Sequence, residues 1–577
     1  MKVFDSVPIK KPAANVFNLS HDVKSSYNFD KIYPFFCELV NPGETFNVSA
    51  EVFMRAMPML APVMHNVDMY IYFVATPLRL VWNERKKYDF RTFITGGEKG
   101  NFGQYGYSDD PSGDYIMPHF RYSQFRSLSS ENRALCLPGG LLDHLGYQPI
   151  KGVQDRWIST DRTEPFTSLP LRVYQFVWNE LFRNQNVQNE VDFSYDTGLE
   201  SPSTLVKLLT MRKKCWEKDY FTSCLPFQQR GETVTLPISS SQSVSASMTG
   251  TGSTVIDMAK YTGQQTAQNL TIGATSNGYA PIRAAVSGGT PSVGTEVELS
   301  GTGDIALNGT ITFTGLSIGT ISDFRYCLRL QQWLENNARC GSRYIEQILA
   351  HFGVRSSDAR LQRPELLGGG KIPLIFSDVP QTSADTLLPD SVNQSVQGNL
   401  AGKGTLYGKT TGFKKYFEEH CIVMGLLTIV PRTSYCQGIK RQWSLMDKTD
   451  FYFPEFAHLS EQAVLNKEVY YDPSAADDED ESLNPDGVFG YQGRFTEYRY
   501  IPSTVHGELR NTLTAWHLGR IFGSLPRLNS DFVEAHSRVN IFAAEDISES
   551  DYDPFVAQIH VNCKAVRPMP KFAVPTL

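Results

Sequence analysis

The feature that most constrains the fold of this chain is a set of strand-like segments placed near both of its ends. From Phe46 to Met54, apolar side chains take every second position, and most of the residues between them are polar. This period of two is typical of a half-buried β-strand. The same alternation runs through 67–74 and 555–564, and a shorter one over 538–541 also predicts a strand. Strands therefore cluster at both ends and are separated by very long intervals.

The intervals between these strands contain few regular elements. The continuous apolar stretch 422–430 predicts a strand that is covered on both faces. Apolar residues recur at helical spacing in 171–181 and 345–352, which predicts two packing helices. Because the helices are few and irregularly spaced, an antiparallel β-barrel with elaborated loops fits better than a parallel α/β sheet. Most of the chain then lies in connections that need partners to order them.

Composition limits the classes of function. The formal net charge is −7, so the chain as a whole does not serve to neutralise nucleic-acid phosphate. Any contact with a polynucleotide must therefore be local. Nine cysteines occur without C-x-x-C spacing, and we interpret them as reduced, buried thiols. Residues 1–11 lack the apolar core of a secretory signal, and the apolar run 421–430 is too short to cross a membrane. We therefore expect cytoplasmic folding and no membrane contact.

Residues 228–320 differ from the rest of the chain. Close to half of them are Gly, Ser or Thr, and charged side chains are sparse. Ile311 and Phe313 alternate with threonines, which predicts a small β-structure within the segment. We expect this insertion to form a protruding surface lobe, with a disordered loop as the alternative.

No motif in the sequence supports catalysis, a cofactor or a metal ion. The glycine-rich segments 368–371 and 402–404 both depart from the phosphate-binding loop pattern, so we interpret their glycines as serving turns and close backbone approach. The eleven histidines show no compact ligand spacing, and no nucleophile elbow is present. We therefore expect a protein that is not an enzyme.

Three further segments leave alternatives open. The acidic run 477–481 predicts a solvated loop, with divalent-cation binding as the alternative. The methionine-rich segment 54–69 serves either core packing or a subunit interface. The C-terminal arm is weakly basic and proline-rich, and its basic residues either face a genome or belong to an ordinary strand end; they are Lys564, Arg567 and Lys571.

Several segments, taken in order, resemble one protein family. The longest runs from Arg343 to Gly370 and reads RYIEQILAHFGVRSSDARLQRPELLGGG. The others are Phe17–His21, Pro42–Gly43, Ala61–His65, Phe93–Gly97, Leu169–Arg172, Tyr174–Gln175, Asn179–Glu180, Arg183–Asn186, Asp219–Ser223, Leu225–Phe227, Phe489–Gln492 and Trp516–Leu518. Together they resemble the major capsid proteins of the Microviridae, and within them the gokushovirus type.

This resemblance implies a fold and a set of partners. It implies an all-β fold in which residues 1–577 form a single eight-stranded viral jelly-roll barrel with long, partly helical loop insertions. Sixty copies would close a T=1 icosahedral shell around circular single-stranded DNA. The insertion 228–320 would correspond to a protrusion used in attachment to a host surface receptor. A separate small basic protein would package the DNA, and the protein would reside in the virion after assembly in the bacterial cytoplasm.

The sequence also allows a second class of function. Jelly rolls also occur in lectins, and aromatic residues make up 12% of this chain, so a carbohydrate-binding protein or glycosidase is the alternative. That reading requires a cleft with paired carboxylates.

Overall fold

The structure is a computed structural model. It describes residues 13–83, 90–95, 117–151, 163–232, 234, 243–250, 256–257, 269–270, 305–312, 321–339, 344–354, 357, 362–382, 398–457, 461–472, 484–543 and 553–572. The acidic run 477–481 and Phe313 lie outside these residues. The chain divides into two compact units, one formed by Met1–Arg230 together with Glu335–Leu577 and the other by Gly231–Leu334.

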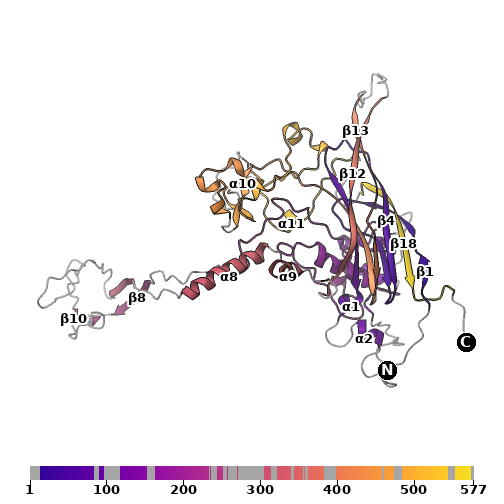
Figure 1. Cartoon of the computed structure of the whole chain (residues 1–577), viewed down its shortest axis with the longest axis horizontal. Coiled ribbons are helices and arrows are strands. Elements are labelled where there is room, and N and C mark those ends of the chain that lie inside the picture. Colours follow the sequence, from indigo (N-terminus) through magenta and orange to yellow (C-terminus); the bar gives the residue numbers. More distant parts are fainter. Residues whose placement is uncertain are drawn as a thin grey trace. The chain divides into compact units, whose positions relative to one another are not determined.

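The larger unit is built around one antiparallel sheet of ten strands. Eight of them follow the order β1-β18-β4-β13-β12-β5-β15-β3, while β14 pairs with β4 and β2 pairs with β18. Figure 1 shows β12, β13, β4, β18 and β1 running side by side. The strands are β1 Asn15–Asn18, β2 His21–Tyr27, β3 Tyr33–Val40, β4 Thr45–Ala56, β5 Val67–Pro77, β12 Glu365–Pro380, β13 Leu400–Lys409, β14 Phe413–Tyr416, β15 Cys421–Pro431 and β18 Phe555–Arg567.

The strands β4 and β18 are buried on one face only. Along β4 and β18, alternate side chains enter the main hydrophobic core, among them Val52 and Ile559. The intervening side chains of both strands are exposed or half-buried. The strand predictions at 46–54 and 555–564 are confirmed, because an alternating sequence buries one side of a pleated strand.

Two adjacent strands of the sheet, β5 and β15, are covered on both faces. Every residue of β15 is buried. Val423 packs in the main core on one face, whereas Met424 packs on the other face in a second core with Val74 of β5. The prediction that 422–430 is a doubly covered strand is confirmed.

Helices supply much of the second core. Leu171 and Val177 come from α6 and Leu205 from α7. The helices predicted at 171–181 and 345–352 are both present, the first continuing from α6 into a π-helical turn over Trp178–Phe182. The α-helices are α1 Leu78–Val81, α2 Phe90–Thr95, α4 Ser130–Ala134, α5 Leu141–His144, α6 Leu169–Val177, α7 Pro202–Leu209, α8 Ile321–Arg339, α9 Tyr344–Phe352, α10 Asn466–Val469 and α11 Ser530–Val533.

Four two-stranded sheets complete the β-structure of the described residues. Two lie in the larger unit: β6 His119–Arg121 with β7 Pro165–Thr167, and β16 Gln462–Leu465 with β17 Val488–Gln492. Two lie in the smaller unit: β8 Ser243–Gly250 with β11 Ile305–Thr312, and β9 Ile256–Asp257 with β10 Asn269–Leu270. The small β-structure predicted around Ile311 is therefore present.

One strand prediction was wrong. Residues 538–541 form irregular chain and a turn. Val539 and Ile541 are nevertheless both buried in the main core, and the Ile541 carbonyl accepts a hydrogen bond from the backbone N–H of Leu60 at 2.9 Å. A loop that packs two apolar side chains inward can produce the same short alternation as a strand.

The glycine-rich segments belong to strands. A Cβ on Gly369 of β12 would lie 2.1 Å from the carbonyl oxygen of Ile71, and one on Gly402 of β13 would lie 2.5 Å from that of Ala61. Since neither position has room for a side chain, glycine is required by close backbone approach. The prediction that these glycines allow close backbone approach is confirmed, but the prediction of turns is wrong, because both segments lie in strands.

The methionines and cysteines serve mainly packing. Met54, Met59 and Met69 are buried in the main core, whereas Met64 is 71% exposed. All eight cysteines in the described part of the chain are free thiols. Burial raises the pKa of the Cys421 and Cys136 thiols to about 12, so both thiols are protonated at neutral pH.

Candidate functional site

The three basic residues predicted to face a genome lie at and beyond the end of β18. Lys564 is exposed on the strand, opposite Asn47 of β4 and Asn18 of β1. Lys571 is exposed a few residues beyond the strand. The structure therefore places these two ammonium groups in solvent but does not bring them together with Arg567 in one cluster.

Arg567 is held by the protein itself. Its Nε atom lies 3.5 Å from Glu44 Oε2, and its guanidinium carbon lies 5.4 Å from the centre of the Phe46 ring. Glu44 is almost fully buried. A guanidinium that balances a buried carboxylate anchors the end of β18, so Arg567 is the least available of the three basic residues.

Lys564 belongs to a larger surface, which we call the open face. The open face consists of the outward-pointing side chains of β1, β2, β4, β13, β14 and β18, on the side of the sheet opposite the main core. It carries two carboxylates, Asp22 and Glu51. Its cationic side chains are Lys24, Arg55, Lys403, Lys409, Lys414 and Lys564. Positive charge dominates this surface, in contrast to the net charge of −7 for the chain.

Both carboxylates of the open face have a partner across a strand pair. Lys409 Nζ lies 2.7 Å from Glu51 Oε1, and His560 Nδ1 lies 2.7 Å from Asp22 Oδ1. The hydrogen bond from Lys409 lowers the pKa of Glu51 below its ordinary value. The other five cations make no ion pair within the described part of the chain, so their charge is available to an anion.

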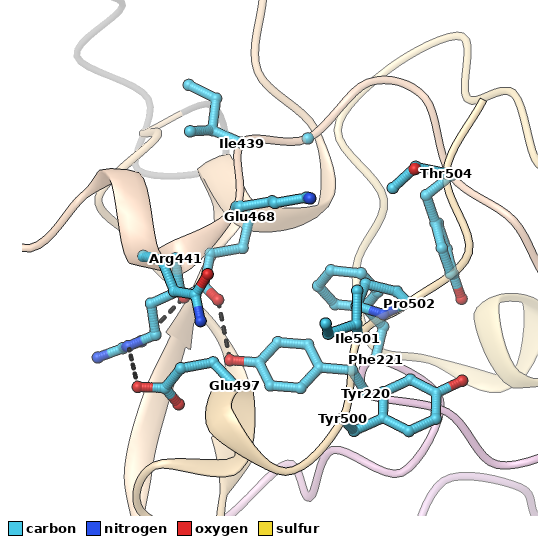
Figure 2. A pocket seen from close by; sticks show the side chains of 14 residues that line it. Tyr220, Phe221, Ile439, Arg441, Glu468, Glu497, Tyr500, Ile501, Pro502 and Thr504 are labelled. Atoms are coloured by element: carbon cyan, nitrogen blue, oxygen red, sulfur yellow. Dashed lines mark hydrogen bonds and ion pairs between the residues drawn. The ribbon is translucent and has the colours of Figure 1, made fainter. Parts of the chain in front are cut away.

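A separate pocket, part of it open to solvent, lies between residues 220–221 and the loops that follow β15 (Figure 2). Phe221, Ile501 and Pro502 form part of its apolar lining. At one end, Arg441 lies between two carboxylates, 2.9 Å from Glu468 and 3.7 Å from Glu497. The pocket combines an apolar wall with one ionic cluster.

The ionic cluster of this pocket is buried and internally paired. Tyr220 donates its hydroxyl hydrogen to Glu468 at 2.9 Å, and Gln462 donates to Glu497 at 2.6 Å. Burial raises the pKa of Glu468, although the backbone N–H of Leu465 and the charge of Arg441 oppose this effect. Burial and the Glu468 carboxylate also raise the pKa of Tyr220, so the hydroxyl stays protonated as a donor. Both carboxylates are thus committed to one guanidinium.

Residues 6–577 match the protein family described as "Capsid protein (F protein)". The chain is 31% identical to capsid protein VP1 of Chlamydia phage 1, over 100% of this chain and 97% of that protein. It is 30% identical to capsid protein VP1 of Bdellovibrio phage phiMH2K, over 99% of this chain and 97% of the relative. This chain belongs to the capsid protein (F protein) family. It is also 27% identical to capsid protein VP1 of Spiroplasma virus 4, over 97% of this chain and 94% of that protein.

Family membership decides between the two classes of function left open by the sequence. The relatives are structural capsid proteins of Microviridae-type phages, so this capsid protein is a virion component and not an enzyme. The glycosidase alternative also needs carboxylates on opposite sides of a substrate, whereas Glu468 and Glu497 share Arg441. We therefore assign the ionic cluster of the pocket to the stability of the surrounding loops.

Among the described residues of this capsid protein, no three or more His, Cys, Asp or Glu side chains are grouped so that they could hold a metal ion. Within the same residues, no helix is both long and apolar enough to span a membrane. The cation-binding alternative for 477–481 falls outside the described chain.

The breadth of the open face was not predicted from the sequence. The predicted basic residues lie at the end of β18, whereas Lys24, Lys403 and Lys414 come from three other strands. Phe53, an aromatic residue in the outward register of β4 that is 43% exposed, was not predicted as part of a surface site either. An aromatic side chain on the polar side of an alternating strand is the signal that could have drawn attention to this surface.

Proposed function

We propose that this protein is the major capsid protein of a gokushovirus-type phage and that sixty copies close a T=1 icosahedral shell around a circular single-stranded DNA genome. The observation that carries the proposal is the match along almost the whole chain to phage capsid proteins. The pairing of β18 with β4 supports a jelly-roll reading of the sheet, because Greek-key β structures return a late strand beside an early one.

Exposed apolar side chains support assembly with further copies. Several of them occur in the loops that follow β15, where Trp443 is 70%, Met446 87% and Ile501 73% exposed. Clusters of exposed large hydrophobic residues usually mark protein interfaces. Burial of these residues against neighbouring copies would also order the long connections of the fold.

Genome contact is proposed for the exposed basic residues Lys564 and Lys571, with Arg567 contributing less because of its ion pair to Glu44. Phosphates gain salt-dependent affinity from such side chains through counterion release. A chain with a net charge of −7 leaves most of the genome charge to be neutralised by another partner. A small basic packaging protein fills that role in the proposal.

The segment 228–320 is proposed to form a surface protrusion that attaches to a host receptor. Most of it falls within the second compact unit, Gly231–Leu334, which has its own strand pairs β8–β11 and β9–β10. A separate unit within a capsid chain can vary without disturbing the barrel that carries it.

Sedimentation and electron microscopy test the proposal. The full-length protein, expressed in a bacterial host with a small basic partner and a single-stranded DNA replicon, should form in the cytoplasm closed particles that contain sixty copies. Nuclease treatment should leave circular single-stranded DNA inside them. A stable monomer under every assembly condition would refute the shell.

A further inference from the structure

Two exposed aromatic side chains lie next to each other on the open face. Tyr407 of β13 pairs with Phe53 of β4, and their side chains are 75% and 43% exposed. Side chains directly opposite each other on adjacent antiparallel strands have Cβ atoms about 5 Å apart. The two rings therefore share one small area of the sheet surface.

The surroundings of the two rings combine apolar and cationic groups. Arg55 places its guanidinium carbon 5.2 Å from the centre of the Phe53 ring. Val556 and Ile375 lie in the neighbouring cross-strand row and are 48% and 64% exposed. Lys24 and Lys403 are exposed on flanking strands. Together these residues form an aromatic centre with cations around it.

We propose that the open face binds single-stranded DNA, with unstacked bases lying against Tyr407 and Phe53 and phosphates held by the surrounding lysines and Arg55. The proposal rests on the genome-enclosing function above and adds to it the site and the mode of contact. Aromatic rings on a flat surface bind the exposed faces of bases, and this contact tolerates any sequence. A shell protein that contacts a whole genome needs such tolerance.

Charge favours a polynucleotide over a second copy of this chain as the occupant. The open face has six cationic side chains and two carboxylates, and both carboxylates already have partners. A second copy carries a net charge of −7 spread over 577 residues, and it would have to desolvate five unpaired cations of this surface. The phosphate backbone of a polynucleotide supplies one anion per nucleotide, at regular intervals, to pair with these cations.

The test measures the affinity of the purified full-length protein for two fluorescent oligonucleotides of equal length, a thymidine 20-mer and its abasic analogue. Wild-type protein should prefer the thymidine oligomer, because only that oligomer offers bases to the rings. Tyr407→Ala and Phe53→Ala should each weaken its binding by about fivefold to a hundredfold. Tyr407→Phe should retain the affinity, because it keeps the ring.

The matched control is Phe352→Ala, which removes an aromatic side chain of α9 that is 78% exposed and outside the sheet. It should leave the affinity for both oligomers unchanged. Lys403→Ala should weaken binding of both oligomers equally and reduce the dependence on salt. Circular dichroism should show the wild-type spectrum for every variant that is compared.

The outcomes separate this inference from the proposed function. If wild-type particles form while Tyr407→Ala and Phe53→Ala bind the thymidine oligomer as tightly as wild type, the stacking site is refuted and the shell is retained. If these variants bind DNA normally but fail to form particles, the open face is an interface between copies and the inference is also overturned. If wild-type protein forms no particles, the proposed function fails, whatever the oligonucleotide result.

Discussion

Asp30 offers a quantitative test of the packing between the N-terminal and C-terminal parts of the chain. The side chain is 3% exposed, and its two oxygens accept hydrogen bonds from the Ser537 backbone N–H at 2.5 Å and the Ser537 hydroxyl at 2.6 Å. Burial raises the pKa of Asp30 from 3.8 to about 6, even though both hydrogen bonds act in the opposite direction. Folding therefore disfavours the charged form of Asp30 relative to the unfolded chain.

The sign of the pH dependence follows from this raised pKa. Asp30 contributes its full stability below pH 3.8, and the contribution is lost as the pH rises through about 6. Because each tenfold change in proton affinity is worth about 1.4 kcal/mol, the loss amounts to about 3 kcal/mol of unfolding free energy. Asn matches the shape of the protonated acid, and it tolerates the φ of +69° at this position. Asp30→Asn should therefore gain stability over wild type as the pH rises.

Guanidinium unfolding of the purified protein, followed by tryptophan fluorescence at a series of pH values, measures this effect. About half of the 3 kcal/mol should appear as a growing difference between Asp30→Asn and wild type from pH 5 to pH 7.5. The matched control is Asp192→Asn, which makes the same chemical change on a side chain that is 97% exposed. Parallel pH curves for Asp30→Asn and wild type would show that the buried carboxylate does not govern this part of the stability.

Three further predictions concern the core. In the native protein the buried guanidinium of Arg172 lies 2.7 Å from Glu200, and Glu200→Gln removes this charge partner. The substitution should lower the unfolding free energy by about 3–5 kcal/mol in thermal or chemical denaturation, and an unchanged midpoint would contradict this prediction. Gly369→Ala should prevent recovery of soluble protein because the new methyl group meets the Ile71 carbonyl, whereas Gly523→Ala, with open space around it, should not. Thiol alkylation at pH 8 should be slow for the buried cysteines until denaturant is added, and rapid labelling of folded protein would refute their burial.

Much of the sheet could be predicted because its strands differ in how they are covered. The alternating strands 46–54 and 555–564 have solvent on one side, and the continuous run 422–430 has a core on each side, so these patterns record burial directly. The alternating segment 67–74 also forms a strand, but both of its faces are buried. The segment 538–541 failed because a loop can bury Val539 and Ile541 without pairing in a ladder.

The open face was harder to predict because it is assembled from distant strands. Tyr407 lies in β13 and Phe53 in β4, and only the pairing register places them together. Lys24 and Lys403 likewise reach this surface from distant parts of the chain, in β2 and β13. Sequence spacing contains no information on such register, so the basic residues predicted from local composition were limited to the end of β18.

The pairing of β18 with β4 has a consequence for synthesis of the protein. Asn15 donates a hydrogen bond to the carbonyl oxygen of Met569, 554 positions later in the chain, and β18 lies between β1 and β4 in the sheet. Until β18 has been synthesised, the edge of β4 that pairs with β18 in the native sheet has no partner strand. Such an unpaired edge can pair with other chains. The ribosome must therefore finish nearly the whole polypeptide before the sheet can close, so a prematurely terminated product cannot adopt the native structure.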